Sequence, residues 1–293
     1  MKQENKEKNT KKKYAYICIA IVFLIGFLFC AAWLIRYFIG NARAEQRFDD
    51  LKEQYVTEQS AVTDMQETVP SSTQEAANTE TMTTEESRYP GLDGYEVPEK
   101  TIDFEALHQE NADIYAWITV PGTVIDYPIL QHSEQVDYYL DHNIDGSKGY
   151  PGCIYTEMYN STDWEDPNTV IYGHNMKNGT MFANLHYYED SEFFEQNPYV
   201  YIYSEDKTRV YQIFGAYEFS DAHLMLNFDF EDPEVFTQYL GGVFELEGIR
   251  NNFNTELEIT SDDKIVTLVT CIANKPEKRY LVQAVLVAEG KLG

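Results

Sequence analysis

The chain has 293 residues, and its 22 Lys and Arg against 49 Asp and Glu give a formal net charge of −27 at pH 7. Such an acidic chain repels the phosphate backbone of nucleic acids, so we expect no nucleic-acid partner. Four cysteines are too few for a disulfide framework in a chain of this length. The length allows one large domain or two small ones.

The N-terminal segment joins a basic stretch to an apolar one. Residues 1–13 hold six lysines, and no charged residue occurs from Ala15 to Ile35. About 20 apolar residues are enough to cross a bilayer as a helix. Lysines before a span keep the N-terminus in the cytoplasm. We therefore predict a cytoplasmic tail at 1–13, a single membrane-spanning signal anchor at 14–39, and an extracytoplasmic remainder.

A cleaved signal peptide is the competing interpretation of this segment. The sequence Ala42-Arg43-Ala44 resembles a signal-peptidase site. The apolar run is, however, longer than the roughly 7–15 residues that are typical of a signal peptide. This length favours an anchor that stays attached.

Residues 40–99 are predicted to link the anchor to a folded domain at 100–293. Residues 41–56 can extend the helix as a polar stalk. From Thr57 to about Pro98 the composition turns to Thr, Glu, Ser and Gln, with few aliphatic side chains. Such a segment cannot bury enough apolar surface to fold by itself. We interpret it as a flexible spacer that holds the domain away from the membrane.

Short β-branched and aromatic segments, separated by turn residues, run through residues 100–293 and indicate strands. Helical spacing interrupts them in several places. Helices are predicted at 103–117, 181–188, 192–196 and 233–246. Strands are predicted at 117–120, 123–130, 152–155, 169–172, 199–203, 210–219 and 257–260, before a closing hairpin. This pattern predicts a mainly β domain, a barrel or sandwich with added helices.

The closing hairpin pairs the strand Val266–Cys271 with the strand Arg279–Val285, and residues 272–278, with Asn274 and Pro276, are predicted to form the loop between them. If Cys271 and Arg279 are directly opposed, their side chains project to the same face, whereas Lys278 has the wrong parity. A thiol beside a fixed positive charge suits a nucleophile. A lone cysteine at a strand end is, however, more often a small buried hydrophobe. The cysteine count also allows a Cys153–Cys271 disulfide, although we interpret Cys153 as a core residue.

His174 is the second candidate for chemistry, because it follows the strand 169–172 directly after Gly173. A histidine in this place can simply bond to the backbone. Cys271 also ends a strand, and active sites favour loop-bearing strand ends on a rigid scaffold. We therefore expect His174 and Cys271 to be partners.

These segments resemble a known family. The residues that carry the likeness are Tyr172-Gly173-His174-Asn175-Met176, Thr267-Leu268-Val269-Thr270-Cys271 and Arg279, together with 122–128 and 178–182. They are similar to the class B sortases, the membrane-anchored cysteine transpeptidases of Gram-positive bacteria. The resemblance covers about residues 100–290. Some relatives have a small polar residue where Val269 stands.

The resemblance implies both a fold and a reaction. It implies a sortase-like β-barrel of about eight strands, with N-terminal helices and a helix between the sixth and seventh strands, here 233–246. It also implies that Cys271 attacks a Thr carbonyl in the C-terminal sorting signal of a surface protein. His174 would act as acid and base, and Arg279 would bind the oxyanion. The acceptor would be an amine of a cell-wall precursor or of a pilin lysine.

Five residues are candidates for peptide contact by the same resemblance: Tyr172, Asn175, Thr270, Thr123 and Tyr127. Two alternatives remain open, a cysteine endopeptidase that uses water and a non-catalytic surface-binding module on a stalk. The acidic cluster from Asp137 to Asp145 can bind a cation, but a solvated face is favoured. We expect no metal and no cofactor, since the sequence has no CxxC, HExxH or Gly-rich phosphate loop.

Overall fold

The computed structural model describes residues 2–58 and 100–291, and these residues divide into two units, Met1–Arg47 and Phe48–Gly293. The predicted spacer lies outside the described residues from residue 59 onward, as do the side chains of the basic tail at 1–13.

The first unit is helical. It belongs to α1, which runs from Lys2 to Tyr55. Its large apolar side chains are exposed, among them Phe23, Phe29 and Trp33. The described part of α1 is long and apolar enough to cross a membrane, which fits the predicted anchor at 14–39.

The second unit begins earlier than the predicted start at residue 100. The side chains of Phe48 and Leu51 are buried, and the ring of Phe48 meets Tyr127 edge to face at 5.6 Å. β1 (Val56–Glu58) then pairs with β2 (Lys100–Ile102). Phe48 and Leu51 are three residues apart, so they share one face of the helix. The polar composition around them conceals this apolar face in the sequence.

The predicted helix at 103–117 is too long. α2 covers only Phe104–Glu110, with the side chain of Asp103 capping its first turn, and β3 (Ile114–Thr119) follows at once. Asn111 ends the helix, and its side-chain oxygen accepts a hydrogen bond from the backbone of Asp113. Ile114 and Trp117 therefore belong to a strand, although their spacing of three also fits a helix.

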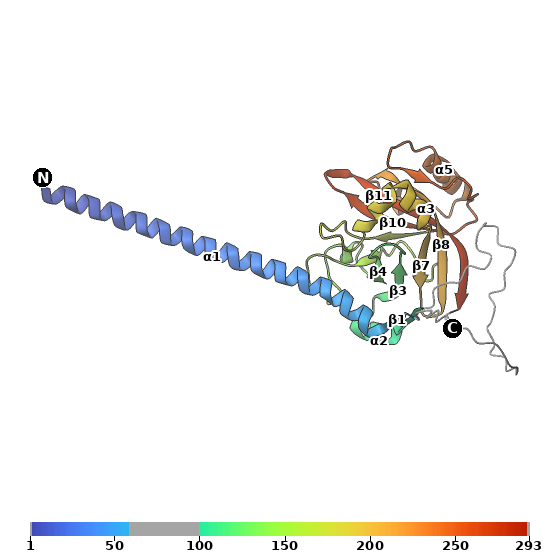
Figure 1. The fold of residues 1–293 in the computed structure, drawn as a ribbon, viewed down its shortest axis with the longest axis horizontal. Helices are drawn as coiled ribbons and strands as arrows, with labels where there is room; N and C mark the ends of the chain where they lie inside the picture. The colour runs from blue at the N-terminus through green and yellow to red at the C-terminus, as the bar shows by residue number, and fades with distance from the viewer. Residues whose placement is uncertain (1, 59–99, 292–293) are drawn as a thin grey trace, which may run out of the picture. The chain divides into compact units, whose positions relative to one another are not determined.

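Eight strands close into a barrel (Figure 1), as predicted, because β11 pairs with both β10 and β8. The order around the barrel is β11-β10-β6-β5-β4-β3-β7-β8, and β9 extends β8 on the outside. Besides β3, the strands are β4 (Asp126–Leu130), β5 (Ile154–Thr156), β6 (Asn168–Tyr172), β7 (Tyr199–Tyr203), β8 (Lys207–Ser220), β9 (Asn252–Phe253), β10 (Ile265–Ile272) and β11 (Lys275–Lys291). Closure pairs the strand edges and leaves few free backbone groups.

Helices fill the connections of the barrel. They are η1 (Tyr138–Leu140), η2 (Ala183–Glu189), α3 (Ser191–Gln196), α4 (Leu224–Asn227) and α5 (Pro233–Phe244). α5 lies between β8 and β10, the sixth and seventh barrel strands, as the resemblance implies. Two predictions are wrong in detail, because η2 is a 3-10 helix and residues 257–260 form no strand.

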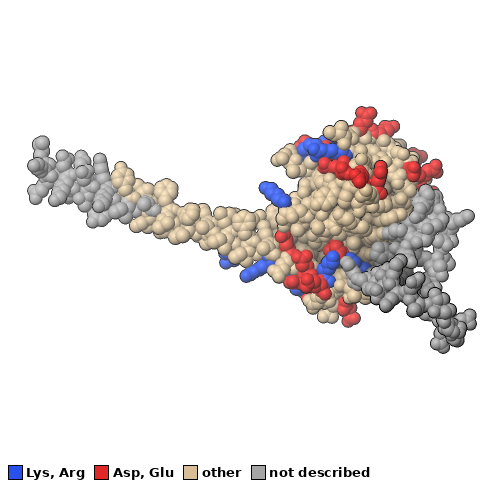
Figure 2. All heavy atoms as spheres, in the orientation of Figure 1, with Lys and Arg blue, Asp and Glu red and all other residues tan. Residues whose placement is uncertain are grey.

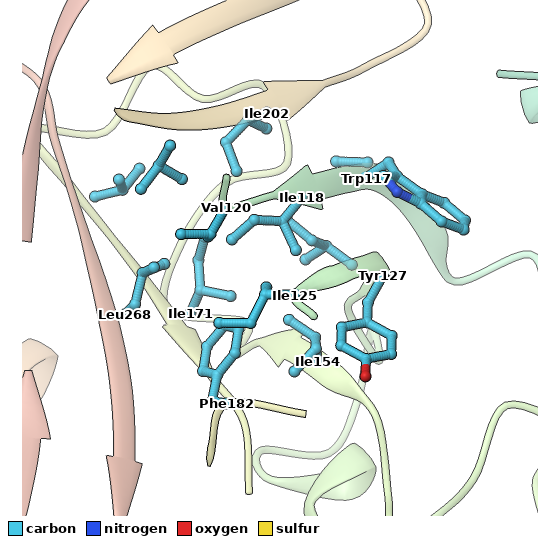
Figure 3. Packing of buried hydrophobic residues seen from close by; sticks show 14 of the residues in the cluster. Trp117, Ile118, Val120, Ile125, Tyr127, Ile154, Ile171, Phe182, Ile202 and Leu268 are labelled. Carbon is cyan, nitrogen blue, oxygen red and sulfur yellow. The ribbon is translucent and has the colours of Figure 1, made fainter. Parts of the chain in front are cut away.

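Two apolar clusters hold the barrel and its additions together. The interior cluster, drawn in Figure 3, brings Ile118, Ile171 and Leu268 together from three strands. The neighbouring residue Val170 belongs to the other cluster, which packs beneath α5. This alternation follows the two-residue period of a strand. Each such fully buried side chain stabilises the fold by about 1.5–3 kcal/mol.

A group of bonded charges fastens the start of the domain to the barrel. The carboxylate of Asp126 is bonded to Lys52, to Lys100 Nζ at 2.5 Å and to Trp117 Nε1 at 2.6 Å. Burial by itself would raise the pKa of Asp126, but the two lysines and the other donors outweigh it and lower that pKa. We call Lys52, Lys100, Trp117 and Asp126 the ion cluster. On the face drawn in Figure 2, acidic side chains form several patches.

Candidate active site

Strands β6 and β10 bring the two chemical segments to one edge of the barrel. They run parallel, with Tyr172 opposite Val269. The pairing continues past the end of β6, because Gly173 N donates to Val269 O at 3.1 Å and Thr270 Oγ1 donates to Gly173 O at 2.8 Å. Gly173 is thus bonded to both Val269 and Thr270, the two residues that precede Cys271. His174 follows Gly173 directly in the chain.

Only glycine fits at position 173. A Cβ atom there would lie 2.5 Å from the side chain of Ile154 and 2.6 Å from that of Phe182. Such distances are far below van der Waals contact, so any side chain would push the strand end outward. The glycine in the Tyr-Gly-His sequence thus lets the histidine segment pack closely against the barrel.

Cys271 is exposed and lies directly opposite Arg279, as the hairpin pattern predicts. The predicted loop at 272–278 is too long, since the turn consists of Ala273 and Asn274, and Asn274 has a φ of 62°. The register shifts immediately after Cys271. Cys153 is a free, buried thiol whose pKa is raised by burial, so the two cysteines form no disulfide.

The ring of His174 is held by the backbone. Its Nε2 lies 2.6 Å from the carbonyl oxygen of Leu140, and its ring lies 5.1 Å from that of Tyr150. Because a carbonyl only accepts hydrogen bonds, Nε2 carries a proton in this arrangement. The backbone bond that we considered as an alternative role is thus present, and it fixes the orientation of a half-buried ring.

Arg279 is oriented by its own turn. Its Nη1 donates to Pro276 O at 2.8 Å and to Lys278 O at 2.9 Å. A guanidinium has five N–H donors, so others remain for a ligand. Burial raises the pKa of Tyr172, as does the charge of Glu157, while the charge of Arg279 opposes them. The guanidinium therefore acts electrostatically on the tyrosine that ends β6.

A carboxylate–histidine pair supports that tyrosine, and we did not predict it from the sequence. Glu157 Oε2 lies 2.5 Å from His223 Nε2, and the centre of the His223 ring lies 6.3 Å from that of Tyr172. Burial raises the pKa of Glu157, although His223 counteracts it. The two partners are 66 residues apart in the chain, so no local pattern reveals the pair.

The five candidates for peptide contact have different surroundings. Thr123 Oγ1 donates to Val120 O. Tyr127 is buried and its hydroxyl accepts a hydrogen bond from Met181 N, while Thr270 is buried and its hydroxyl donates to Gly173 O. The hydroxyl groups of these three side chains thus form hydrogen bonds to the backbone of the protein. Tyr172 is half-buried, and Asn175 donates from its amide to Cys271 O at 2.9 Å.

Acidic side chains of the domain do not assemble into a metal site in the part of the chain that the structure describes. Within it, no three His, Cys, Asp or Glu side chains are grouped so that they could hold an ion. The acidic segment from Asp137 to Asp145 is included in this statement.

Comparison with known proteins decides the family. Residues 118–287 match the model of the sortase domain. The chain belongs to the sortase family. Sortase B of Listeria monocytogenes is 36% identical over 186 residues, which cover 62% of this chain and 73% of that protein. Sortase B of Staphylococcus aureus is 28% identical over 186 residues, covering 63% of this chain and 74% of that protein.

Solved structures of sortases agree with this assignment. Sortase B of Clostridium perfringens is 31% identical with a TM-score of 0.57, and the match covers 64% of this chain and all of that one. A substrate complex of the Staphylococcus aureus sortase B is 28% identical with a TM-score of 0.56, over 63% of this chain and 84% of that one. The sortase described here is thus of class B, a cysteine transpeptidase with the class B fold.

Proposed function

We propose that this sortase cleaves the C-terminal sorting signal of a surface protein after a threonine and joins the new carboxyl end to an amine. The arrangement of β6 and β10 carries the proposal. Their parallel pairing ends beside Gly173 and Val269, which supports a shared site for His174 and Cys271.

The first half of the reaction forms a thioester. The Cys271 thiolate attacks the carbonyl carbon of the threonine, and the electron pair moves to the carbonyl oxygen. Arg279 stabilises that oxyanion with a permanent positive charge. Its planar guanidinium also places its donors in a fixed geometry that the ammonium group of lysine lacks. The intermediate then collapses, the peptide C–N bond breaks, and His174 donates a proton to the leaving amine.

The second half releases the product. The incoming amine attacks the thioester carbonyl, and His174 accepts the proton that the amine loses. The C–S bond breaks, and the Cys271 thiolate is restored. We propose a cell-wall precursor or a pilin lysine as the source of the amine.

The proposed location follows from the anchor. A helix across the bilayer, with the lysine-rich tail in the cytoplasm, would hold the domain at the outer face of the membrane. Both substrates, the sorting signal and the acceptor amine, occur at that face. Of the candidates for peptide contact, Tyr172 best combines partial exposure with proximity to the charge of Arg279.

One assay tests this proposal. The purified protein is incubated with peptides from C-terminal sorting signals, with and without triglycine, and the products are identified by mass. We expect cleavage after threonine and a product that carries triglycine at the new end. His174→Ala should abolish both products. Cleavage that yields only the free acid in excess triglycine would make the protein an endopeptidase and contradict transfer.

A further inference from the structure

The carbonyl oxygen of Cys271 is held by side chains, where a strand would normally supply backbone donors. In the β6–β10 ladder, Gly173 N donates to Val269 O, and the next β10 carbonyl that faces β6 belongs to Cys271. The backbone of Asn175 has turned away to form a bridge with Met181. The amide Nδ2 of Asn175 donates to the Cys271 oxygen at 2.9 Å.

A second side chain reaches the same carbonyl from η2. His186 Nε2 lies 3.0 Å from Cys271 O and 3.0 Å from Asn175 Nδ2. Its other nitrogen, Nδ1, lies 2.7 Å from Glu189 Oε1, and Arg250 pairs with the second oxygen of Glu189 at 3.1 Å. The ring also stacks on Tyr280 at 5.0 Å, so its plane is fixed.

The donors and acceptors of Glu189, His186, Asn175 and the Cys271 carbonyl complement one another. In the neutral ring of His186, the proton is on Nδ1, where Glu189 accepts it, so Nε2 is an acceptor. Nε2 then accepts one proton of the Asn175 amide, and the other proton of that amide is donated to Cys271 O. When the ring carries a second proton, Nε2 itself donates to Cys271 O. The carbonyl of the nucleophile therefore keeps a donor in both states of the ring.

We propose that Glu189, His186 and Asn175 form a positioning relay that fixes the backbone of Cys271, and hence the direction of its sulfur. The inference rests on the proposed role of Cys271 as nucleophile. The end of the β6–β10 pairing at Val269 and Tyr172 gives the relay its purpose. β11 still pairs with Cys271 and Ile272 on one side, but on the β6 side the Cys271 carbonyl would otherwise lack a backbone donor.

The test uses His186→Phe in the full-length protein, because phenylalanine keeps the ring on Tyr280 and removes both nitrogens. Misplacing a reacting group by about 1 Å can cost on the order of 10²-fold in rate. We expect kcat to fall by about 10- to 100-fold, with KM changed less than about threefold. His186→Gln should restore most of the rate, because its amide can donate at the position of Nε2.

The matched control is His108→Phe, since His108 also lies near a glutamate, Glu205 at 3.7 Å, but is not bonded to Cys271. It should leave kcat unchanged. Hydrogen exchange in the peptide that contains Cys271 provides a readout without substrate. Exchange there should be faster in His186→Phe than in the wild type or in His108→Phe.

The outcomes separate the relay from the proposed function. If the wild type does not cleave any sorting peptide, the proposed function fails, while hydrogen exchange still decides whether His186 holds the strand end. If the wild type is active and His186→Phe matches it in kcat, or if exchange near Cys271 is unchanged, the relay is wrong. Equal loss in His186→Gln and His186→Phe also overturns it.

Discussion

The proposed catalytic edge, with Cys271, His174 and Arg279, and the ion cluster around Asp126 use polar side chains in opposite ways. In the ion cluster, the Asp126 side chain is 11% exposed and that of Lys100 is 4% exposed, and their charges neutralise each other. At the catalytic edge, Cys271 is exposed, and the bonds of His174 and Arg279 go to backbone carbonyls.

The difference separates residues that hold the fold from residues that we propose react with the substrate. A backbone carbonyl orients an imidazole or a guanidinium without cancelling its charge as a carboxylate would, so the charge remains effective toward a substrate. In the ion cluster the ammonium and carboxylate groups are paired with each other, so they contribute to stability and not to chemistry. Substitutions in the two regions should therefore affect different measurements.

The largest expected effect is that of Cys271→Ala, which should remove all peptide cleavage because it deletes the sulfur on which the proposed thioester forms. Its melting temperature should stay within about 1–2 °C of the wild type, because the side chain is exposed. The matched control is Cys153→Ala, a change at the buried cysteine, which should lower the melting temperature and keep the activity. Cleavage by Cys271→Ala would remove the mechanism.

Asp126→Asn should have the next largest effect, on stability alone. Removing one partner of a buried ion pair leaves the other charge uncompensated, which costs about 3–5 kcal/mol. Chemical denaturation measures this loss, and kcat at a temperature where the variant is folded should match the wild type. The exposed carboxylate of Asp262 gives the control, because Asp262→Asn should change neither quantity. A normal unfolding midpoint for Asp126→Asn would show that the ion cluster is dispensable.

Arg279→Lys should reduce kcat by about 10²–10³-fold, which corresponds to about 2.7–4 kcal/mol of oxyanion stabilisation. Lysine keeps the charge but loses the planar donors. Steady-state peptide cleavage measures the rate, and Lys278→Arg, at the position of opposite parity, should be close to wild type. Full activity of Arg279→Lys would mean that a point charge suffices or that the oxyanion is bound elsewhere.

The smallest effect concerns the acid stability of the ion cluster. The pKa of Asp126 in the folded protein is below its ordinary value of 3.8. The stabilisation by its ionised form is therefore complete well above pH 3.8 and is lost as the pH falls through the lower folded value. Between pH 6 and about pH 3, the free energy of unfolding should fall more steeply for the wild type than for Asp126→Asn. Parallel curves would contradict this assignment.

The sequence allows the catalytic edge to be predicted better than its support. The β-branched residues around Cys271 and the parity of Arg279 are local signals. The structure agrees with both, since β10 and β11 form a hairpin with Cys271 opposite Arg279. The contact of His186 with the Cys271 carbonyl joins residues that are 85 positions apart. The spacing around His186 also resembles a helix, so nothing local indicates that its ring turns toward Cys271.

The boundaries were harder to predict for a related reason. Ile114 and Trp117 fit a helical period, and only the bonds of Asn111 show where the helix ends. Phe48 lies in a segment of polar composition, so its burial depends on a partner, Tyr127, far along the chain. Tertiary contacts, which one sequence does not display, decided both cases.

The central claim is that the Cys271 sulfur forms a thioester with the threonine of a sorting signal. Incubation with a cleavable sorting peptide in the absence of an acceptor amine, followed by acid quenching and mass spectrometry, tests it directly. The account predicts a protein mass increased by the peptide up to its threonine, with the added mass on Cys271 and lost on addition of triglycine. Peptide cleavage without an adduct, or with an adduct on another residue, would contradict it.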